Sequence, residues 1–403
     1  MKKHLLSIAA CLSVSLIFSA CSKEKSAPPA APEKPAPVAA DIRAKGERSL
    51  EKGVAFLLSK QLPDGSWLRD PAVTALVCTA LHESGTEEQA ERVADAVEKG
   101  RLIILDKVQN DGSFMGSEPN YINYTTATCL YALAVINHPN DTEIMRKARH
   151  FLIDLQLDED NAKNPTAKSD PFHGGIGYGS GGPTRPDLSN TQLALEALYV
   201  TEHLDTEVGG GTPEDAAKAK LAWENAIGFL KNVQNIPDGT DETWVVPAET
   251  DLTNDGGFIY RPDQSKASDK HEEESLRSYG SMTYAGLKSM IYAKLDKDDY
   301  RVKAATEWAR RNYTLDENPG MGPEGHYYYL MTFAKAHAAL GKDTIQTIDN
   351  DIRDWREDVI NKLAGTQKED GHWVNDINGR WMEGMSELVT AYSLIALELA
   401  MKE

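Results

Sequence analysis

Near the start of the chain stands the stretch Lys52-Gly53-Val54-Ala55-Phe56-Leu57, followed by Gln61 and then by Gly65-Ser66-Trp67. Its first part is a helical run, and a Pro-Asp-Gly turn then leads to the indole. The same phrase returns in weaker form around four later glutamines, which are Gln109, Gln156, Gln234 and Gln367. The copy at Gln367 also keeps the indole, as Trp373. A phrase repeated in this way predicts a repeated helix–turn–helix unit.

Apolar residues recur at steps of three and four residues in two alternating sets of runs, which indicates amphipathic helices. The first helix of each unit is predicted at 44–60, 88–107, 142–155, 213–234, 300–313 and 345–367. The second helix is predicted at 72–82, 125–136, 189–202, 281–294, 327–340 and 387–401. One hairpin cannot bury its own apolar face, so about six hairpins are expected to stack into one all-α domain over residues 41–403. Periodicity alone leaves open whether the stack is an open solenoid or a closed ring.

A family resemblance addresses that choice. The residues Lys52, Gly53, Phe56, Leu57, Gln61, Gly65 and Trp67 match the Gln-Trp repeat of squalene–hopene cyclases. The chain thus resembles that family, and the related β subunits of protein prenyltransferases, over roughly residues 45–400. The resemblance implies a closed α/α toroid with six inner helices around a central cavity. It also implies that the Gln and Trp residues stack between hairpins and cap them. A shared fold does not by itself define a reaction.

Long Gly/Pro-rich insertions interrupt the repeat at 158–187 and 237–278. They lie on the side of the expected ring where the second helices begin. Insertions of this length are either functional or disordered.

The N-terminal 40 residues read as targeting sequence. Residues 1–20 combine Lys2 and Lys3 with a short apolar run and small residues, which is typical of a signal peptide. Cys21 follows a lipobox-like junction and is the expected lipidation site, although ordinary cleavage after Ala20 is the alternative. Residues 21–40 are a Pro/Ala-rich tether without an apolar period. We therefore expect an envelope lipoprotein that is anchored in the membrane, on the periplasmic face of the outer membrane of a Gram-negative-type bacterium.

The chain is strongly acidic, with a formal net charge of −19. This charge argues against nucleic acid as a partner. Two cysteines of the repeat region, Cys78 and Cys129, lie in apolar helical runs and are expected to be buried free thiols. The Asp-x-Cys pair that prenyltransferases use for zinc is missing, so we expect neither a metal nor a cofactor. Protein partners cannot be named from the sequence.

One segment invites comparison with the cyclase active site. The sequence Asp187-Leu188-Ser189-Asn190-Thr191 stands where squalene–hopene cyclases carry Asp-x-Asp-Asp-Thr. The resemblance makes the middle position the general acid, but it is Ser189 here, and Asn190 replaces the next acid. A serine cannot protonate an alkene, so Asp187 alone remains as a catalytic candidate. The alternative is that Asp187 and Ser189 simply cap a helix.

Further candidates begin the later second helices. They would gather with Asp187 at one mouth of the ring as a ligand cavity: Arg185, Ser189, Asn190, Tyr279, His326, Trp381, Glu383 and Glu387. By contrast, Tyr284 and Tyr328 are expected to pack between helices. The favoured interpretation is an anchored repeat protein that binds an apolar or isoprenoid-like ligand. The alternatives are a divergent terpene cyclase that uses Asp187, Glu383 or Glu387, a carbohydrate-active toroid with Asp187 and Glu383 as paired carboxylates, and an interaction scaffold.

Overall fold

The computed structural model describes residues 37–116, 118–179, 185–237, 254–267 and 276–402. The compact unit from Ala36 to Glu403 contains all of these residues. The predicted signal peptide, Cys21 and nearly all of the predicted tether lie outside the described residues. In the described ranges, no helix is long and apolar enough to cross a membrane.

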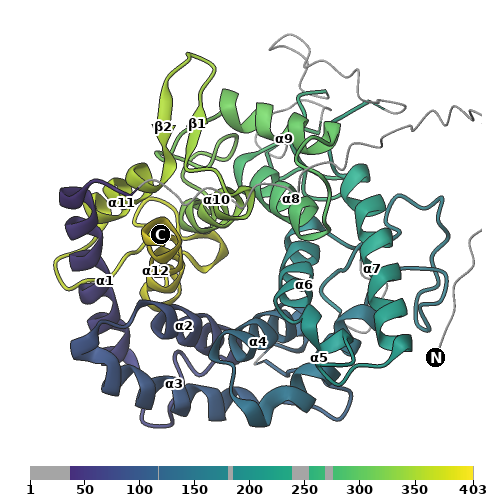
Figure 1. Ribbon diagram of the computed structural model, residues 1–403, viewed down its shortest axis with the longest axis horizontal. Helices are drawn as coiled ribbons and strands as arrows, with labels where there is room; N and C mark the ends of the chain where they lie inside the picture. Colours follow the sequence, from purple (N-terminus) through teal and green to yellow (C-terminus); the bar gives the residue numbers. More distant parts are fainter. Residues whose placement is uncertain (1–36, 117, 180–184, 238–253, 268–275, 403) are drawn as a thin grey trace, which may run out of the picture. The chain divides into compact units, whose positions relative to one another are not determined.

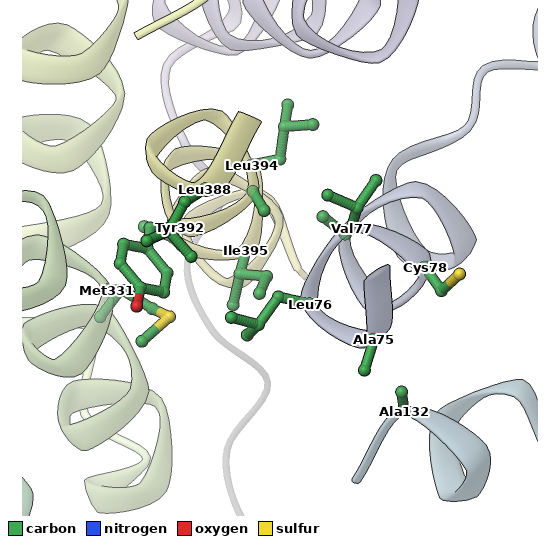
Figure 2. Packing of buried hydrophobic residues seen from close by; sticks show 14 of the residues in the cluster. Ala75, Leu76, Val77, Cys78, Ala132, Met331, Leu388, Tyr392, Leu394 and Ile395 are labelled. Carbon is green, nitrogen blue, oxygen red and sulfur yellow. The ribbon is translucent and has the colours of Figure 1, made fainter. Parts of the chain in front are cut away.

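Among the described residues, six inner helices form a closed ring, which Figure 1 shows end-on. They are α2 (Pro71–Ser84), α4 (Ile122–Ile136), α6 (Leu188–Val200), α8 (Gly280–Tyr292), α10 (His326–Leu340) and α12 (Ser386–Met401). Each packs against the next in chain order, and α12 packs against α2. In consequence, α4 and α10 lie opposite each other across the ring. Between α12 and α2, Ile395 lies beside Leu76, and Tyr392 lies beside Met331 of α10 (Figure 2).

In the same described ranges, six outer helices surround this ring (Figure 1). They are α1 (Ala40–Lys60), α3 (Ala90–Leu105), α5 (Thr142–Asp154), α7 (Pro213–Asn232), α9 (Tyr300–Arg311) and α11 (Trp355–Thr366). Helices α3, α5 and α9 pack on the inner helix that precedes them, and α1 packs on α12. Gly53 permits this last contact, because a Cβ there would stand 2.8 Å from Leu394 Cδ2. The predicted all-α fold of stacked hairpins is confirmed, and the stack is closed.

The repeat glutamines join neighbouring outer helices. In four copies the side-chain Nε2 donates to two backbone carbonyls at 2.8–3.0 Å. One acceptor is the glycine of the glutamine's own turn, and the other lies in the next outer helix. The pairs of acceptors are Gly65 and Ala96 for Gln61, Gly174 and Ala222 for Gln156, Gly256 and Arg301 for Gln234, and Gly371 and Ser49 for Gln367. The Gln367 bond to α1 links the two ends of the ring.

Gln109 departs from this role. Its Nε2 donates to the carbonyl of Lys107, only two residues away, and the contact is exposed.

We therefore expect Gln156→Ala to lower the free energy of unfolding by about 2–3 kcal/mol, since two carbonyls lose their buried donor. Gln109→Ala is the matched control, with an expected change within about 0.5 kcal/mol. Denaturant titration of both variants measures the difference, and equal effects would contradict the role of Gln156 in joining two outer helices.

A second repeated bond fixes each turn on its inner helix. The backbone N–H of the residue that follows the turn donates to a threonine Oγ1 at 2.9–3.1 Å. The donor–acceptor pairs are Trp67–Thr74, Phe114–Thr126, Ile176–Thr191, Phe258–Thr283 and Trp373–Thr390. In addition, the indole Nε1 atoms of Trp67 and Trp373 donate to Leu57 O and Leu363 O, at the ends of α1 and α11. The two indole bonds tie α1 and α11 to the turns that follow them.

Two features of the fold bear on the sequence predictions. The helix predicted at 345–367 was wrong for residues 345–354, where β1 (Thr344–Gln346) pairs antiparallel with β2 (Ile352–Asp354), and α11 begins at Trp355. β-branched residues favour strands here, and Asn350 adopts a φ of +65° in the intervening turn. The prediction that Cys78 and Cys129 are buried free thiols is confirmed.

Candidate functional site

We call the end of the ring where the inner helices begin the N-terminal mouth. Asp187 lies there as the N-cap of α6 and is buried. Its Oδ1 accepts from Asn190 N at 2.9 Å, and its Oδ2 accepts from Asn190 Nδ2 at 2.8 Å. Burial raises the pKa of Asp187 to about 6, although the bonds from Asn190 and from the Tyr260 hydroxyl favour the ionised form. Asp187 thus holds a helix end and its own neighbour.

Glu383 has the corresponding place at α10. This helix begins after Gly325, which has no side chain to cap it. Glu383 Oε1 accepts from Tyr328 N at 2.8 Å, and Oε2 accepts from Asn375 Nδ2 at 2.7 Å. Burial raises the pKa of Glu383 to about 7, and these bonds oppose the rise. A carboxylate is a favourable ligand for a helix N-terminus, so Glu383 is an N-cap supplied from another segment.

The two carboxyl groups proposed as acids therefore already have partners. Each has one oxygen on a helix N–H and the other on an asparagine amide. The third candidate, Glu387, lies in the first turn of α12 and accepts from Ser386 Oγ at 3.0 Å. Within the described ranges, no three His, Cys, Asp or Glu side chains are grouped closely enough to hold a metal ion.

Four further mouth candidates lie away from the ring interior. Arg185 is exposed and forms an ion pair with Asp263. Asn190 is buried against Asp187, and its backbone carbonyl accepts from Asn123 of α4. Tyr279 is buried in an apolar cluster beside α8, and His326 Nε2 contacts the carbonyl of Leu315 at 2.8 Å. These four side chains find their partners outside the ring interior. The sequence could not show this, because a residue at a helix start can point into the wall as readily as into the ring.

A first layer of side chains crosses the ring near the mouth. Tyr328 of α10 reaches α6, where its hydroxyl lies 3.1 Å from Gln192 Nε2 and 3.4 Å from Ser189 Oγ. Its ring also lies 6.1 Å from that of Tyr392, which is hydrogen-bonded to Tyr124 of α4. We call Tyr124, Ser189, Gln192, Tyr328 and Tyr392 the tyrosine layer. Tyr328 was expected to pack between helices, but its side chain extends into the ring interior and its hydroxyl reaches α6. Tyr284 is buried, as expected.

A second layer lies deeper. Glu196, Lys335 and Tyr131 each follow a residue of the tyrosine layer by seven positions, about 10 Å along the helix. Glu196 Oε2 accepts from Lys288 Nζ at 2.8 Å, and Oε1 lies 2.9 Å from Lys335 Nζ. Lys335 Nζ also lies 4.7 Å from the ring centre of Tyr131, on the opposite side of the ring. We call Tyr131, Glu196, Lys288 and Lys335 the lysine layer.

The charges of the lysine layer are buried. The side chains of Lys288, Lys335 and Glu196 keep 1%, 7% and 4% of their exposure. Burial alone would raise the pKa of Glu196, but the two ammonium groups reverse this and hold it well below its usual value. Burial lowers the pKa of Lys288 to about 8, against the attraction of Glu196 and together with repulsion from Lys335. One carboxylate thus faces two ammonium groups.

The rim of the N-terminal mouth exposes apolar side chains. Leu68, Trp381, Met382 and Met385 keep 40–51% of their exposure, on the loops that precede α2 and α12. Tyr121 and Tyr178 continue the rim in front of α4 and α6, with ring centres 5.3 Å apart. These loops are strained, because Leu68, Arg69, Trp381 and Met382 have φ between 54° and 68°. Left-handed backbone at non-glycine residues costs free energy and is concentrated at functional sites.

The lysine layer was missed in the sequence, although a signal existed. Glu196, Lys288 and Lys335 are each a lone charge inside an apolar run of an inner helix. A charged residue is rarely buried without a partner, so three such positions on helices of one ring indicate a shared cluster. The pairing itself requires the ring geometry.

No protein-family model matches the chain, and no curated protein matches it. Several solved structures do. The α-1,6-mannanase GH76A from Salegentibacter sp. HEL1_6 matches with a TM-score of 0.53 and 13% identity, over 90% of this chain and 99% of the mannanase. The type II terpene cyclase MstE from Scytonema matches with 0.51 and 14%, over 88% and 98%. A protein from Actinoplanes matches with 0.50 and 15%, over 89% and 100%. At these identities the comparisons establish an α/α toroid fold, and the fold alone.

Proposed function

We propose that this chain is an envelope-anchored toroid that binds an apolar or isoprenoid-like small molecule at its N-terminal mouth. The observation that carries the proposal is the group of exposed apolar side chains on strained loops around that mouth. Exposed apolar side chains gathered in one place mark a binding site more often than chance. A lipid on Cys21 would hold the ring near a membrane, where such ligands are concentrated.

Two further observations support a ligand site that lacks the cyclase acid. The carboxyl groups of Asp187 and Glu383 cap helices, so neither is free to act as the acid of a cyclase. A protein of the same fold, a variant of the terpene cyclase MstE, holds geranylgeranyl dihydroxybenzoate in its structure. This neighbour supports the proposal of an isoprenoid-like ligand.

The test compares the ligand that co-purifies with variants of the rim. Trp381→Ala removes the largest exposed apolar side chain of the rim, and we expect it to lower ligand retention by about tenfold. Ile352→Ser is the matched control, because Ile352 is 73% exposed on β2, remote in sequence from the mouth loops. Mass spectrometry of organic extracts quantifies the ligand, and circular dichroism checks that both variants fold. Equal loss in both variants, or no loss in either, would contradict a ligand site at the rim.

A further inference from the structure

The lysine layer has unused hydrogen-bonding capacity. An ammonium group carries three N–H donors. Within the part of the chain that the structure describes, Glu196 is the one hydrogen-bond acceptor that Lys288 Nζ and Lys335 Nζ contact. Most of the donors of two buried ammonium groups therefore point at no protein acceptor.

The layer also has a charge imbalance. Two ammonium groups and one carboxylate leave a net charge of +1, and the three side chains that carry these charges are at least 93% buried. A buried charge without a partner is costly, and proteins normally compensate it. Tyr131 and Tyr292 lie under the two ammonium groups as aromatic faces but bring no negative charge.

An unpaired acceptor lies one helical turn away. Gln192 Oε1 has no hydrogen-bond partner, although Gln192 is only 1% exposed. Gln192 and Glu196 are four residues apart and so share one face of α6. A ligand that lies against this face of α6 can satisfy both residues' surroundings. It would offer an anionic oxygen to Lys288 and Lys335 and a hydroxyl donor to Gln192 Oε1.

Three tyrosines of the two layers keep part of their exposure. Tyr124, Tyr131 and Tyr328 are half-buried rather than buried. Tyr131 and Tyr328 contact side chains from across the ring, so they face the interior. Their remaining exposure is consequently to the inside of the ring.

We propose that the lysine layer is an internal binding site for a phosphate group, held by Lys288 and Lys335 through its anionic oxygens and by Gln192 through its P–O–H. A phosphate monoanion carries both the charge and the donor that the site lacks. The group can belong to free dihydrogen phosphate or to the monoanion of a phosphate monoester headgroup. The site does not depend on the apolar rim, and it is tested with a different ligand.

The experiment titrates the purified full-length chain, in non-ionic detergent, with inorganic phosphate and separately with dodecyl phosphate, by calorimetry. One-to-one binding of inorganic phosphate identifies a site for the free anion, and binding of dodecyl phosphate alone identifies a site for a headgroup. Lys335→Met should weaken the affinity for phosphate by on the order of 10- to 100-fold, because it removes one charge-assisted hydrogen bond. Lys335→Arg should retain it. Lys294→Met, at an exposed lysine paired with Glu202, is the matched control.

The pH dependence gives a second readout. Lys288 must be protonated to bind, so affinity should fall as the pH rises through about 8. Glu196 does not titrate near that pH because its pKa is strongly lowered, and Tyr131 and Tyr292 do not because their pKa values are raised. The phosphate group itself loses its second proton with a pKa of about 6, so affinity should already begin to fall below pH 8. The proposal is overturned if neither phosphate binds, or if Lys335→Met binds as well as wild type.

Discussion

A Gly174→Ala variant is expected to lose about 3–5 kcal/mol of its free energy of unfolding, the sum of backbone strain and overlap. Gly174 has a φ of +83°, which an alanine adopts only at a cost. A Cβ at this position would stand 1.9 Å from the carbonyl oxygen of Asn225 in α7. Neither backbone segment can move freely, because Gln156 binds the carbonyls of both Gly174 and Ala222.

Gly228, in α7 itself, is the matched control. A Cβ there would meet no atom within 4 Å. Because alanine is the better helix former, Gly228→Ala should gain about 0.5–1 kcal/mol. Thermal unfolding of the two variants beside wild type measures both signs. A Gly174→Ala variant as stable as wild type would show that the turn does not approach the outer helix as described.

The second large effect is expected at Glu196. Glu196→Gln removes the carboxylate that two buried lysines share and leaves a charge of +2 in the ring interior. Breaking a buried ion pair by removing one partner costs about 3–5 kcal/mol. We expect a destabilisation of that size, measured by denaturant titration at pH 7.

The matched variant removes a positive charge instead. Lys335→Met leaves Glu196 and Lys288 as a neutral pair. The unbranched, apolar side chain of the new methionine can still cover the ring of Tyr131. We expect its stability to lie within about 1 kcal/mol of wild type, since an apolar replacement that removes a net charge is often neutral. If both variants lose the same stability, the effect comes from packing and not from charge balance.

The ring could be predicted because its determinants are local and repeated. Gln61, Gly65 and Trp67 lie close together in the sequence. Each forms a hydrogen bond that involves the backbone and that any copy of the unit needs. The later copies were harder to complete, because insertions separate the glutamine from its turn. Gln156 binds Gly174 and Gln234 binds Gly256, at separations of 18 and 22 residues. A Gly-Gly pair before an apolar residue marks both turns in the sequence.

The site was less predictable because its contacts join distant helices. The position of Glu383 before α12 suggested a catalytic role at the mouth, but its partner is the start of α10, 55 residues earlier. Likewise, Tyr328 could be placed on a helix from its pattern, while its direction across the ring depends on how α10 packs. Periodicity assigns a residue to a face of a helix, and only the closed ring decides which face looks inward.

The most direct test of the account is mass spectrometry of an organic extract of the purified wild-type chain, beside Trp381→Ala and Ile352→Ser prepared in parallel. We predict one apolar or isoprenoid-like compound at close to one equivalent in wild type and in Ile352→Ser, reduced about tenfold in Trp381→Ala. An extract without any bound compound, or one whose content is the same in all three proteins, would contradict a ligand site at the N-terminal mouth.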